Sequence, residues 1–181
     1  EDAMAAMREI TESEASGATA RIYNEIRVAY AAPYVSSLFR HLAIYPGLLE
    51  WSWEVTRPAF ESGALQHTGW NQVDVSALPA LAPISREALR ELGVSVAGEA
   101  VIRDVCRTFT RVSPVNLVFA GCLARLLRGQ AGEMGSAPSP APRDLPPALP
   151  QLPGMVPWDA LDPTRRAVVD VFETTLAGDA F

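Results

Sequence analysis

Three prolines, Pro33, Pro46 and Pro58, divide residues 17–58 into short segments whose apolar side chains recur at helical spacing. Proline lacks a backbone N–H and its ring clashes with the preceding turn, so a helix seldom continues past one. Apolar residues three or four positions apart line one face of a helix. The predicted amphipathic helices run over about residues 17–32, 34–45 and 48–60.

The rest of the chain also has helical rather than strand periodicity. We expect a loop or bend at residues 67–71 and a proline-containing connector at 78–83. A short helix over 84–92 should end at Gly93, since glycine commonly terminates helices. Two further helices are predicted, over 96–109 and 114–127, because Pro114 suits the first turn of a helix. The side chains expected to face inward from the first of these are Val101, Ile102, Val105 and Phe109.

No segment alternates apolar and polar residues with the period of two that a half-buried strand requires. The predicted fold class is therefore all-α. Residues 1–130 should form a helical domain. Residues 131–158 should form an extended arm, because eight prolines fall within residues 138–157. Asp162 and Pro163 are a good cap and first-turn pair, so residues 159–181 should form a C-terminal helix that docks on this domain or on a partner.

Charge and composition exclude several function classes. The net charge of −6 argues against nucleic-acid binding, which needs a basic surface. No apolar run reaches the length of a membrane span and no signal peptide is evident, so we expect a cytoplasmic protein without membrane contact. All 15 cationic residues are arginines, which indicates a high-GC, actinobacterial genome. Chemistry based on a Schiff-base lysine is excluded.

The cysteines and histidines do not form a recognisable metal motif. Cys106 and Cys122 are expected on separate helices as small core residues, and His41 and His67 do not complete a ligand set by spacing. We therefore predict neither a metal nor a cofactor.

Asp74 is the carboxylate singled out as a catalytic base. It lies among apolar residues, and desolvation would raise the pKa of its carboxyl toward neutrality. The alternative is a loop or helix-capping aspartate.

Other polar residues are candidates for binding a small-molecule substrate. Ser36 and Ser37 have hydroxyls suited to a substrate carboxylate, or they are small residues at a helix crossing. Arg40 needs an anionic partner, either a substrate carboxylate or an internal one such as Glu54. Asn116 is expected to orient a substrate or leaving group through its amide, or to bridge two helices.

The tryptophans are candidates for an apolar pocket that excludes water. The candidates are Trp51, Trp53 and Trp70, which lie in the first half of the chain. Core packing is the alternative role.

The order and spacing of several motifs resemble those of halocarboxylic acid dehalogenases of the DehI type. The motifs are Tyr-x-x-Ile at 23–26, Leu-Phe-Arg-x-Leu-Ala at 38–43, aromatic-Pro-Gly-x-Leu at 45–49, Trp53 and, more weakly, Ser-Pro-Val-Asn-Leu at 113–117. The similarity covers about residues 15–130. It implies an all-α fold with two repeats packed as a pseudo-dimer around the active site. In that family an aspartate activates water, which displaces halide without a covalent enzyme ester.

This chain departs from the family pattern. It is long enough for one repeat and an arm, and its last helix resembles the first helix of a second repeat. The position equivalent to the water-activating aspartate is near Ser36, which cannot act as a carboxylate base. A complete active site therefore requires a second homologous lobe.

Three functions remain open from the sequence. In the first, the chain is a subunit of a dimeric, heteromeric enzyme that closes a strained nitrogen ring such as an aziridine by intramolecular displacement in actinobacterial natural-product biosynthesis. In the second, it is a hydrolytic 2-haloacid dehalogenase that acts as a homodimer with Asp74 as the base. In the third, it is a non-catalytic partner that stabilises a catalytic homologue.

Overall fold

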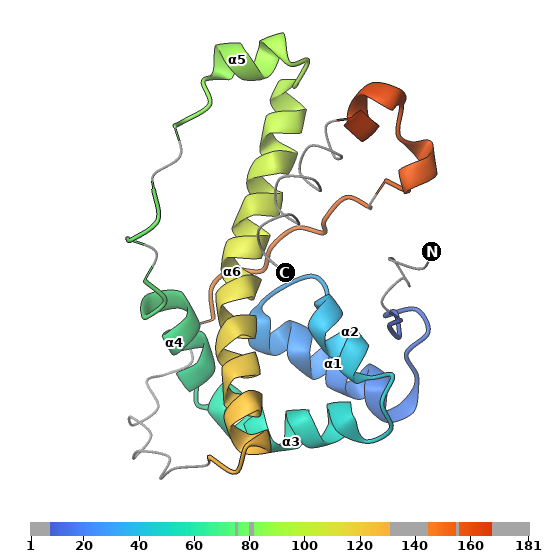
Figure 1. The fold of residues 1–181 in the computed structure, drawn as a ribbon, viewed down its shortest axis with the longest axis vertical. Coiled ribbons are helices and arrows are strands. Elements are labelled where there is room, and N and C mark those ends of the chain that lie inside the picture. Colours follow the sequence, from blue (N-terminus) through green and yellow to red (C-terminus); the bar gives the residue numbers. More distant parts are fainter. Residues whose placement is uncertain (1–7, 75, 80–81, 131–144, 155, 168–181) are drawn as a thin grey trace.

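The computed structural model describes residues 8–74, 76–79, 82–130, 145–154 and 156–167. Within these ranges the chain is helical and contains no strand, so the all-α prediction is confirmed (Figure 1). The elements are α1 (Gly17–Tyr30), α2 (Ser37–Leu42), α3 (Leu48–Glu61), α4 (Ala64–Asn71), α5 (Arg86–Glu91), α6 (Val96–Leu127) and the 3-10 helix η1 (Trp158–Ala160). None of the helices in the described ranges has the length and apolar character that crossing a bilayer demands.

Helix α6 is the central element, and α1 to α4 pack around its second half (Figure 1). We predicted two helices separated before Pro114, but one helix of 32 residues runs through that proline. Thr108 and Val112 before Pro114 and Val115 and Phe119 after it are all buried on the same face. Burial of this continuous face offsets the one backbone hydrogen bond that proline removes.

The core is an aromatic cluster between the first three helices and α6. The ring of Phe39 on α2 lies 4.6 Å from that of Phe119 on α6 and 5.8 Å from that of Tyr30 on α1. Phe60 on α3 lies 5.4 Å from Tyr30 and 5.0 Å from Trp53. Centroid separations in this range are favourable for tilted and edge-on aromatic pairs.

The first three helices follow the predicted order with adjusted ends. The second is shorter than expected, because residues 34–36 are extended and the helix begins at Ser37. Pro58 does not end α3, which continues to Glu61. The Pro58 ring is exposed, and the helix around it is anchored by the buried residues Trp53, Thr56 and Phe60.

Helix α4 occupies the segment for which we predicted a loop. Gly63 adopts a φ of +78° and starts the new helix. Buried Gln66 ties it to its neighbours, because its amide donates hydrogen bonds to the carbonyls of Ala29 and Phe60, both at 3.1 Å. Gly69 lets α4 approach α6 closely, so the glycine that suggested a bend is instead a packing residue.

Substituting Gly69 with alanine should destabilise the fold. A Cβ there would lie 2.9 Å from both Cγ2 and the backbone nitrogen of Val115, so α4 and α6 would have to separate. We expect the free energy of unfolding to fall by about 1–3 kcal/mol, as for overpacked cores. Gly121→Ala on α6 is the matched control, since its Cβ would meet nothing within 4 Å. That change should be neutral or stabilising by up to about 1 kcal/mol. Chemical denaturation of both variants measures the difference, and equal effects would contradict this account.

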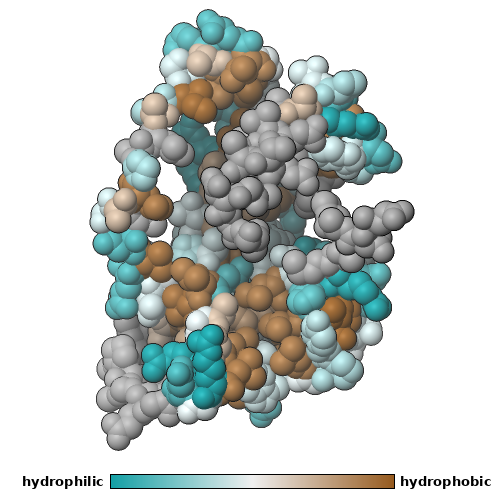
Figure 2. Space-filling model, viewed as in Figure 1, coloured by the Kyte–Doolittle hydropathy of each residue, from teal (hydrophilic) through white to brown (hydrophobic). Residues whose placement is uncertain are grey.

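The first half of α6 extends beyond the α1–α4 core and carries α5 at its tip (Figure 1). Gly93 has a φ of +77° and follows α5, as predicted. The inward orientation predicted for Val101, Ile102 and Phe109 is wrong: these side chains are about half exposed. The reason is that α1 to α4 contact α6 beyond this stretch. On the face seen in Figure 2, hydrophobic residues gather over the core and again near the α5 tip.

The described part of the proline-rich arm is extended and contacts the α1–α2 loop. The Arg111 guanidinium donates to the carbonyls of Ala31 (2.9 Å) and Pro147 (2.6 Å), and the Gln151 amide approaches the Pro33 carbonyl at 3.5 Å. Residues 131–144 lie outside the described residues, and the three-part domain division stays a prediction. The N–H of Arg165 donates to Asp162 Oδ1 at 2.9 Å, as expected for the predicted cap, while residues 168–181 of the expected C-terminal helix lie outside the described residues.

Candidate functional site

Ser36 occupies the position immediately before α2, at the edge of the core. The extended backbone before it is held by Glu12, whose carboxylate accepts a hydrogen bond from Val35 N–H at 2.9 Å. Ser36 is only 8% exposed, and its hydroxyl neither caps α2 nor finds another partner. Its neighbour Ser37 is exposed. The structure therefore separates the two predicted serines and leaves the Ser36 hydroxyl as the better candidate.

Asn116 lies on α6 and its side chain is partly buried. Its amide oxygen is buried without a hydrogen-bond partner. We place it near Ser36 because Asn116 precedes Phe119 by one helical turn, Ser36 precedes Phe39 by about one turn, and the Phe39 and Phe119 rings are in contact. We call this region of the α2–α6 contact the Ser36–Asn116 site.

Burial of two unpartnered polar atoms at one place is energetically unfavourable, because each has lost its water without gaining a hydrogen bond. The hydroxyls of Tyr30 and Ser52 also lack partners, but these residues are 2% and 0% exposed and belong to the closed core. Ser36 and Asn116 lie at the core's edge. A ligand with hydrogen-bonding groups is therefore a physically reasonable partner for them.

Tyr34 is a polar residue beside this site that the sequence analysis missed. Its side chain is half-buried and packs against the core, and this burial raises the pKa of its phenol above the ordinary value, with the charge of Arg40 opposing the shift. The signal available in the sequence was its position two residues before Ser36. Tyr23, by contrast, has a structural role, because its hydroxyl donates a hydrogen bond to the Ile10 carbonyl at 2.8 Å. Desolvation raises the pKa of Tyr23 to about 12.

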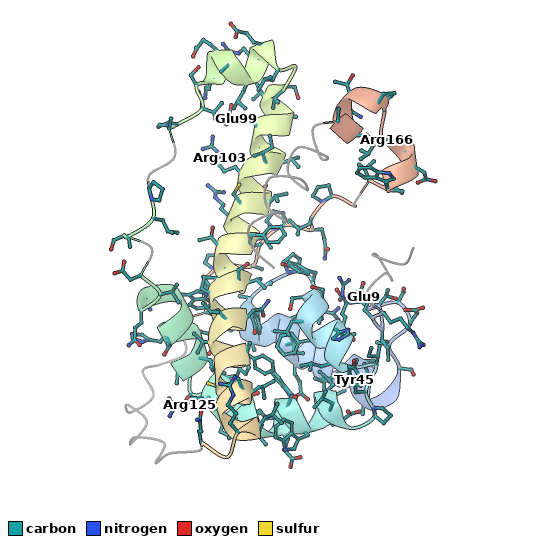
Figure 3. All side chains as sticks on the ribbon, in the orientation of Figure 1. Glu9, Tyr45, Glu99, Arg103, Arg125 and Arg166 are labelled. Atoms are coloured by element: carbon teal, nitrogen blue, oxygen red, sulfur yellow. The ribbon has the colours of Figure 1, made fainter. Side chains whose placement is uncertain are left out.

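Arg40 is paired within the chain. Its Nε lies 3.2 Å from a carboxylate oxygen of Glu9, and both side chains are partly exposed (Figure 3 labels Glu9). Glu54, the internal partner considered from the sequence, is exposed on α3 and forms no ion pair with it. A substrate carboxylate would have to share this guanidinium with Glu9 or replace it.

The tryptophans do not converge on one pocket. Trp53 is buried in the core and donates from its indole N–H to Glu25 on α1 at 2.6 Å. Trp70 on α4 donates to the Arg111 carbonyl on α6 at 2.8 Å. Trp51 is 37% exposed. The indoles of Trp53 and Trp70 are thus held by different pairs of helices, as expected for packing residues.

Asp74 does not have the desolvated environment that we predicted. It is exposed beyond the end of α4, and its carboxylate accepts the backbone N–H of Ser76 at 2.8 Å. That hydrogen bond stabilises the charged form and lowers the pKa of the carboxyl. The apolar residues near Asp74 in the sequence do not desolvate its carboxylate, because the segment leads away from the core.

Both cysteines lie on α6 rather than on separate helices. Cys106 is exposed, so the prediction that both are core residues is wrong for it. Cys122 is partly buried, and desolvation raises the pKa of its thiol. Among the described residues no group of three or more His, Cys, Asp or Glu side chains is arranged to hold a metal.

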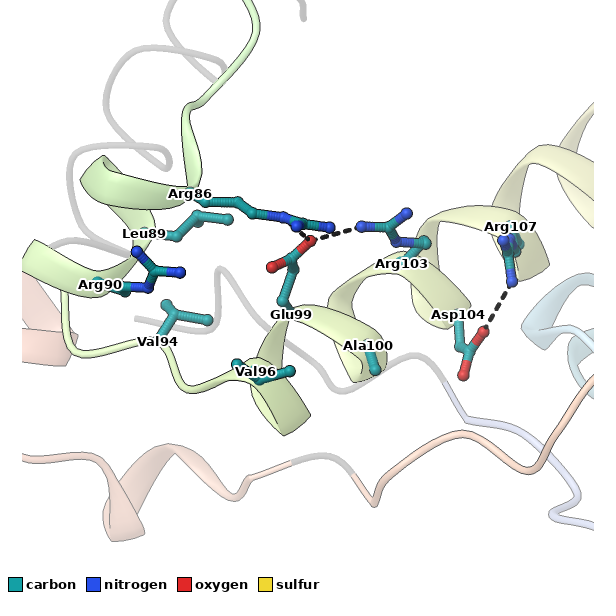
Figure 4. Close-up of a pocket in the computed structure, with 10 residues that line it drawn as sticks. All are labelled: Arg86, Leu89, Arg90, Val94, Val96, Glu99, Ala100, Arg103, Asp104 and Arg107. Atoms are coloured by element: carbon teal, nitrogen blue, oxygen red, sulfur yellow. Dashed lines mark hydrogen bonds and ion pairs between the residues drawn. The ribbon is translucent and has the colours of Figure 1, made fainter.

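Ser36 and Asn116 do not line either of two hollows in the described part of the molecule. One, of about 380 Å³, lies between α1 and α3 beside Glu25, Trp53 and Arg57. The other, of about 460 Å³, lies between α5 and the first half of α6 (Figure 4). The Ser36–Asn116 site is therefore separate from both hollows.

The fold matches solved structures of D-2-haloacid dehalogenases. A mutant of such an enzyme superposes with a TM-score of 0.70 at 23% sequence identity, covering 94% of this chain and 61% of its own. A mutant in complex with D-2-CPA gives 0.68 at 24% identity, and a complex with L-LA gives 0.70 at 23%, with the same coverage. No protein-family model matches the chain, and no curated protein matches its sequence.

This likeness establishes the fold and not the activity. The chain adopts the helical architecture of these dehalogenases over nearly all of its length. It spans about three fifths of the length of the chains that it matches.

Proposed function

We propose that this chain is one lobe of a two-lobed, cofactor-independent enzyme that displaces a leaving group from saturated carbon in a small molecule. The observation that carries the proposal is the fold match, over 94% of this chain, to proteins named D-2-haloacid dehalogenases, of which it covers only 61%. A second lobe, from a homologous chain or a second copy, would supply what the shorter chain lacks and would close over the Ser36–Asn116 site.

In this proposal Ser36 and Asn116 bind and orient the substrate. The Ser36 hydroxyl would donate a hydrogen bond to the substrate's carboxylate or leaving group, which lowers the cost of the charge that develops as the bond breaks, and the Asn116 amide oxygen would accept one from an N–H of the substrate amine. Ser37 begins α2, Arg40 follows one turn later in the last turn of that helix, and both would assist from α2. Trp53 and Trp70 would act indirectly, by holding the core against which the site is built.

The nucleophile that fits best belongs to the substrate. Asp74, our candidate base, is exposed with a lowered pKa, which makes it a poor acceptor of a proton from water. An amine within the substrate needs no activated water: its nitrogen attacks the carbon that bears the leaving group, the carbon–leaving group bond breaks, and the ring nitrogen then releases a proton to solvent or a base. The product is an aziridine. Orientation of the two groups in line is the protein's main contribution, with effects of several kcal/mol on the barrier.

Hydrolytic displacement is the second candidate, because the structural neighbours are named as dehalogenases. There a homodimer would use Asp74 as the base, and the base would have to gain a drier environment from the partner. A stabilising role beside a catalytic homologue is the third reading of the same incomplete site.

Chloride release separates these functions. The purified chain, alone and with any homologue encoded beside it, is assayed with D- and L-2-chloropropionate and with 2-amino-3-chloropropionate, whose amine can close an aziridine ring. We expect accelerated release, over the rate without protein, only from the amine-bearing substrate, with the ring product seen by mass spectrometry. Release from 2-chloropropionate that is lost in Asp74→Asn supports hydrolysis instead.

Native mass spectrometry on the same samples tests the need for a second lobe. We expect activity only in preparations that contain a dimer or a heteromer. A strictly monomeric chain that is fully active would contradict the two-lobe proposal. Activity of a heteromer that survives disruption of the Ser36–Asn116 site would assign the chemistry to the partner.

A further inference from the structure

The hollow between α5 and α6 lies on the half of α6 that is remote from the Ser36–Asn116 site (Figures 1 and 4). It holds about 460 Å³, a volume within the range of small-molecule sites. Serine side chains fix its two walls, because Ser85 caps α5 by accepting from Ala88 N–H and Ser95 caps α6 by accepting from Gly98 N–H, both at 3.1 Å. The hollow is therefore built on two capped helices rather than on an unstructured loop.

Four arginines line this hollow against two carboxylates. The cations are those of Arg86, Arg90, Arg103 and Arg107, and the anions are those of Glu99 and Asp104. The lining thus carries two more positive than negative charges, in a chain whose net charge is −6. A local excess of positive charge attracts anionic ligands, even on a protein whose net charge is negative.

The arrangement concentrates positive charge at one carboxylate. A single oxygen of Glu99, Oε1, lies 3.4 Å from Nε of Arg86 and 2.5 Å from Nη2 of Arg103 (Figure 4). Two guanidinium groups from different helices are thereby held close together by one negative charge. Their mutual repulsion is only half balanced, because one carboxylate neutralises one cation.

The other two arginines, Arg90 and Arg107, provide further guanidinium groups at the two ends of the hollow. Arg90 has only a distant partner, Glu87, at 3.9 Å, and Glu87 is itself mostly exposed and outside the lining. Figure 4 shows the Arg90 guanidinium directed toward Glu99 across the apolar side chains of Leu89 and Val94. Arg107 pairs with Asp104 at 3.4 Å on the next turn of α6. All four guanidinium groups are more than half exposed, so their N–H donors are accessible to a ligand.

We propose that this hollow binds a small anion with two acidic groups, of the diphosphate or dicarboxylate type. Planar guanidinium groups donate paired hydrogen bonds to carboxylate and phosphate oxygens, which distinguishes them from point charges. One acidic group is bound between Arg86 and Arg103 and the second by Arg90. The site does not depend on the displacement activity proposed above, since it lies on the other half of α6.

Calorimetric titration at low ionic strength, of about one tenth the physiological value, tests the site. Inorganic pyrophosphate and succinate are the probes, so that the two acid chemistries are distinguished. The variants are Arg90→Gln and Arg103→Gln, each of which removes one charge from the hollow. Arg125→Gln is the matched control, because Arg125 is an exposed arginine near the other end of α6 and outside the hollow (Figure 3).

We expect one probe to bind at a single site with a dissociation constant below about 1 mM, a modest affinity. Each hollow variant should weaken binding by about tenfold, as for loss of one charge-assisted hydrogen-bonding group. Arg125→Gln should bind like the parent chain. Circular dichroism should show unchanged helix content, since all three side chains are exposed. Absence of binding by both probes, or equal weakening by Arg125→Gln, would overturn the proposal.

Discussion

Replacing Phe119 with alanine is expected to lower the free energy of unfolding by about 3–5 kcal/mol, the usual cost of removing a buried aromatic ring. Phe119 is fully buried, and its ring lies 4.6 Å from that of Phe39 and 6.2 Å from that of Phe60. Its loss leaves a cavity where α2, α3 and α6 meet. These elements cannot close over it without separating other aromatic contacts.

Leu117→Ala is the control for this prediction. Leu117 lies on the same helix two residues away but is 64% exposed. Its truncation should change stability by no more than about 0.5 kcal/mol. Urea denaturation followed by circular dichroism compares the two variants. Similar effects of the two truncations would show that the second half of α6 is not packed as described.

Replacing Asn116 with alanine is expected to lower the proposed displacement activity by about 100-fold or more, as when one preorganised hydrogen-bonding group is lost from an active site. Its stability should not fall in parallel. The Asn116 amide oxygen is buried and has no hydrogen-bond partner among the described residues, so removing it relieves an unfavourable burial rather than breaking a bond. A loss of activity without a loss of stability is the signature of a binding residue.

The control for Asn116 is Asn71→Ala on α4. The Asn71 amide is exposed and donates only to the His67 carbonyl of its own helix, at 3.1 Å. This variant should retain activity. Kinetics and denaturation are measured on both variants in the assembled enzyme. Retention of activity by Asn116→Ala, or loss of activity that tracks unfolding, would remove Asn116 from the site.

The local parts of the fold were predictable because their signals are local. Apolar residues at helical spacing predicted α1 to α3. Gly93 predicted the end of α5, and in the structure its backbone adopts a φ of +77° there. The Asp162–Pro163 pair predicted the cap that Arg165 N–H completes. Each of these effects acts within one or two helical turns, so a single sequence contains it.

The errors share one cause, which is that contacts with distant segments overrode the local signal. Pro114 does not divide α6, because residues on both sides of it are buried against α1 to α4. Gly69 does not break α4, because a residue without a side chain lets that helix approach Val115. Asp74 is solvated rather than desolvated, because the chain leaves the core after α4. None of these effects can be predicted from the residues next to Pro114, Gly69 or Asp74 in the sequence.

The candidate site residues remain predictions, and the structure adds their burial and their surroundings. Ser36 and Asn116 were named from the sequence, but their burial without partners is a property of the packed helices. Tyr34 and the arginine-lined hollow were not named at all. The arginines of that hollow are up to 21 positions apart along the chain and converge only because α5 folds back on α6.

The sequence by itself determined that this protein is built from amphipathic helices and carries a net charge of −6, because residue spacing and charge are properties of the chain alone. Only the tertiary structure decided which apolar face is covered, which polar atoms lose their water and where the arginines gather. These depend on contacts between residues far apart in the sequence. Burial, and with it the strength of hydrogen bonds and charges, exists only after those contacts have formed.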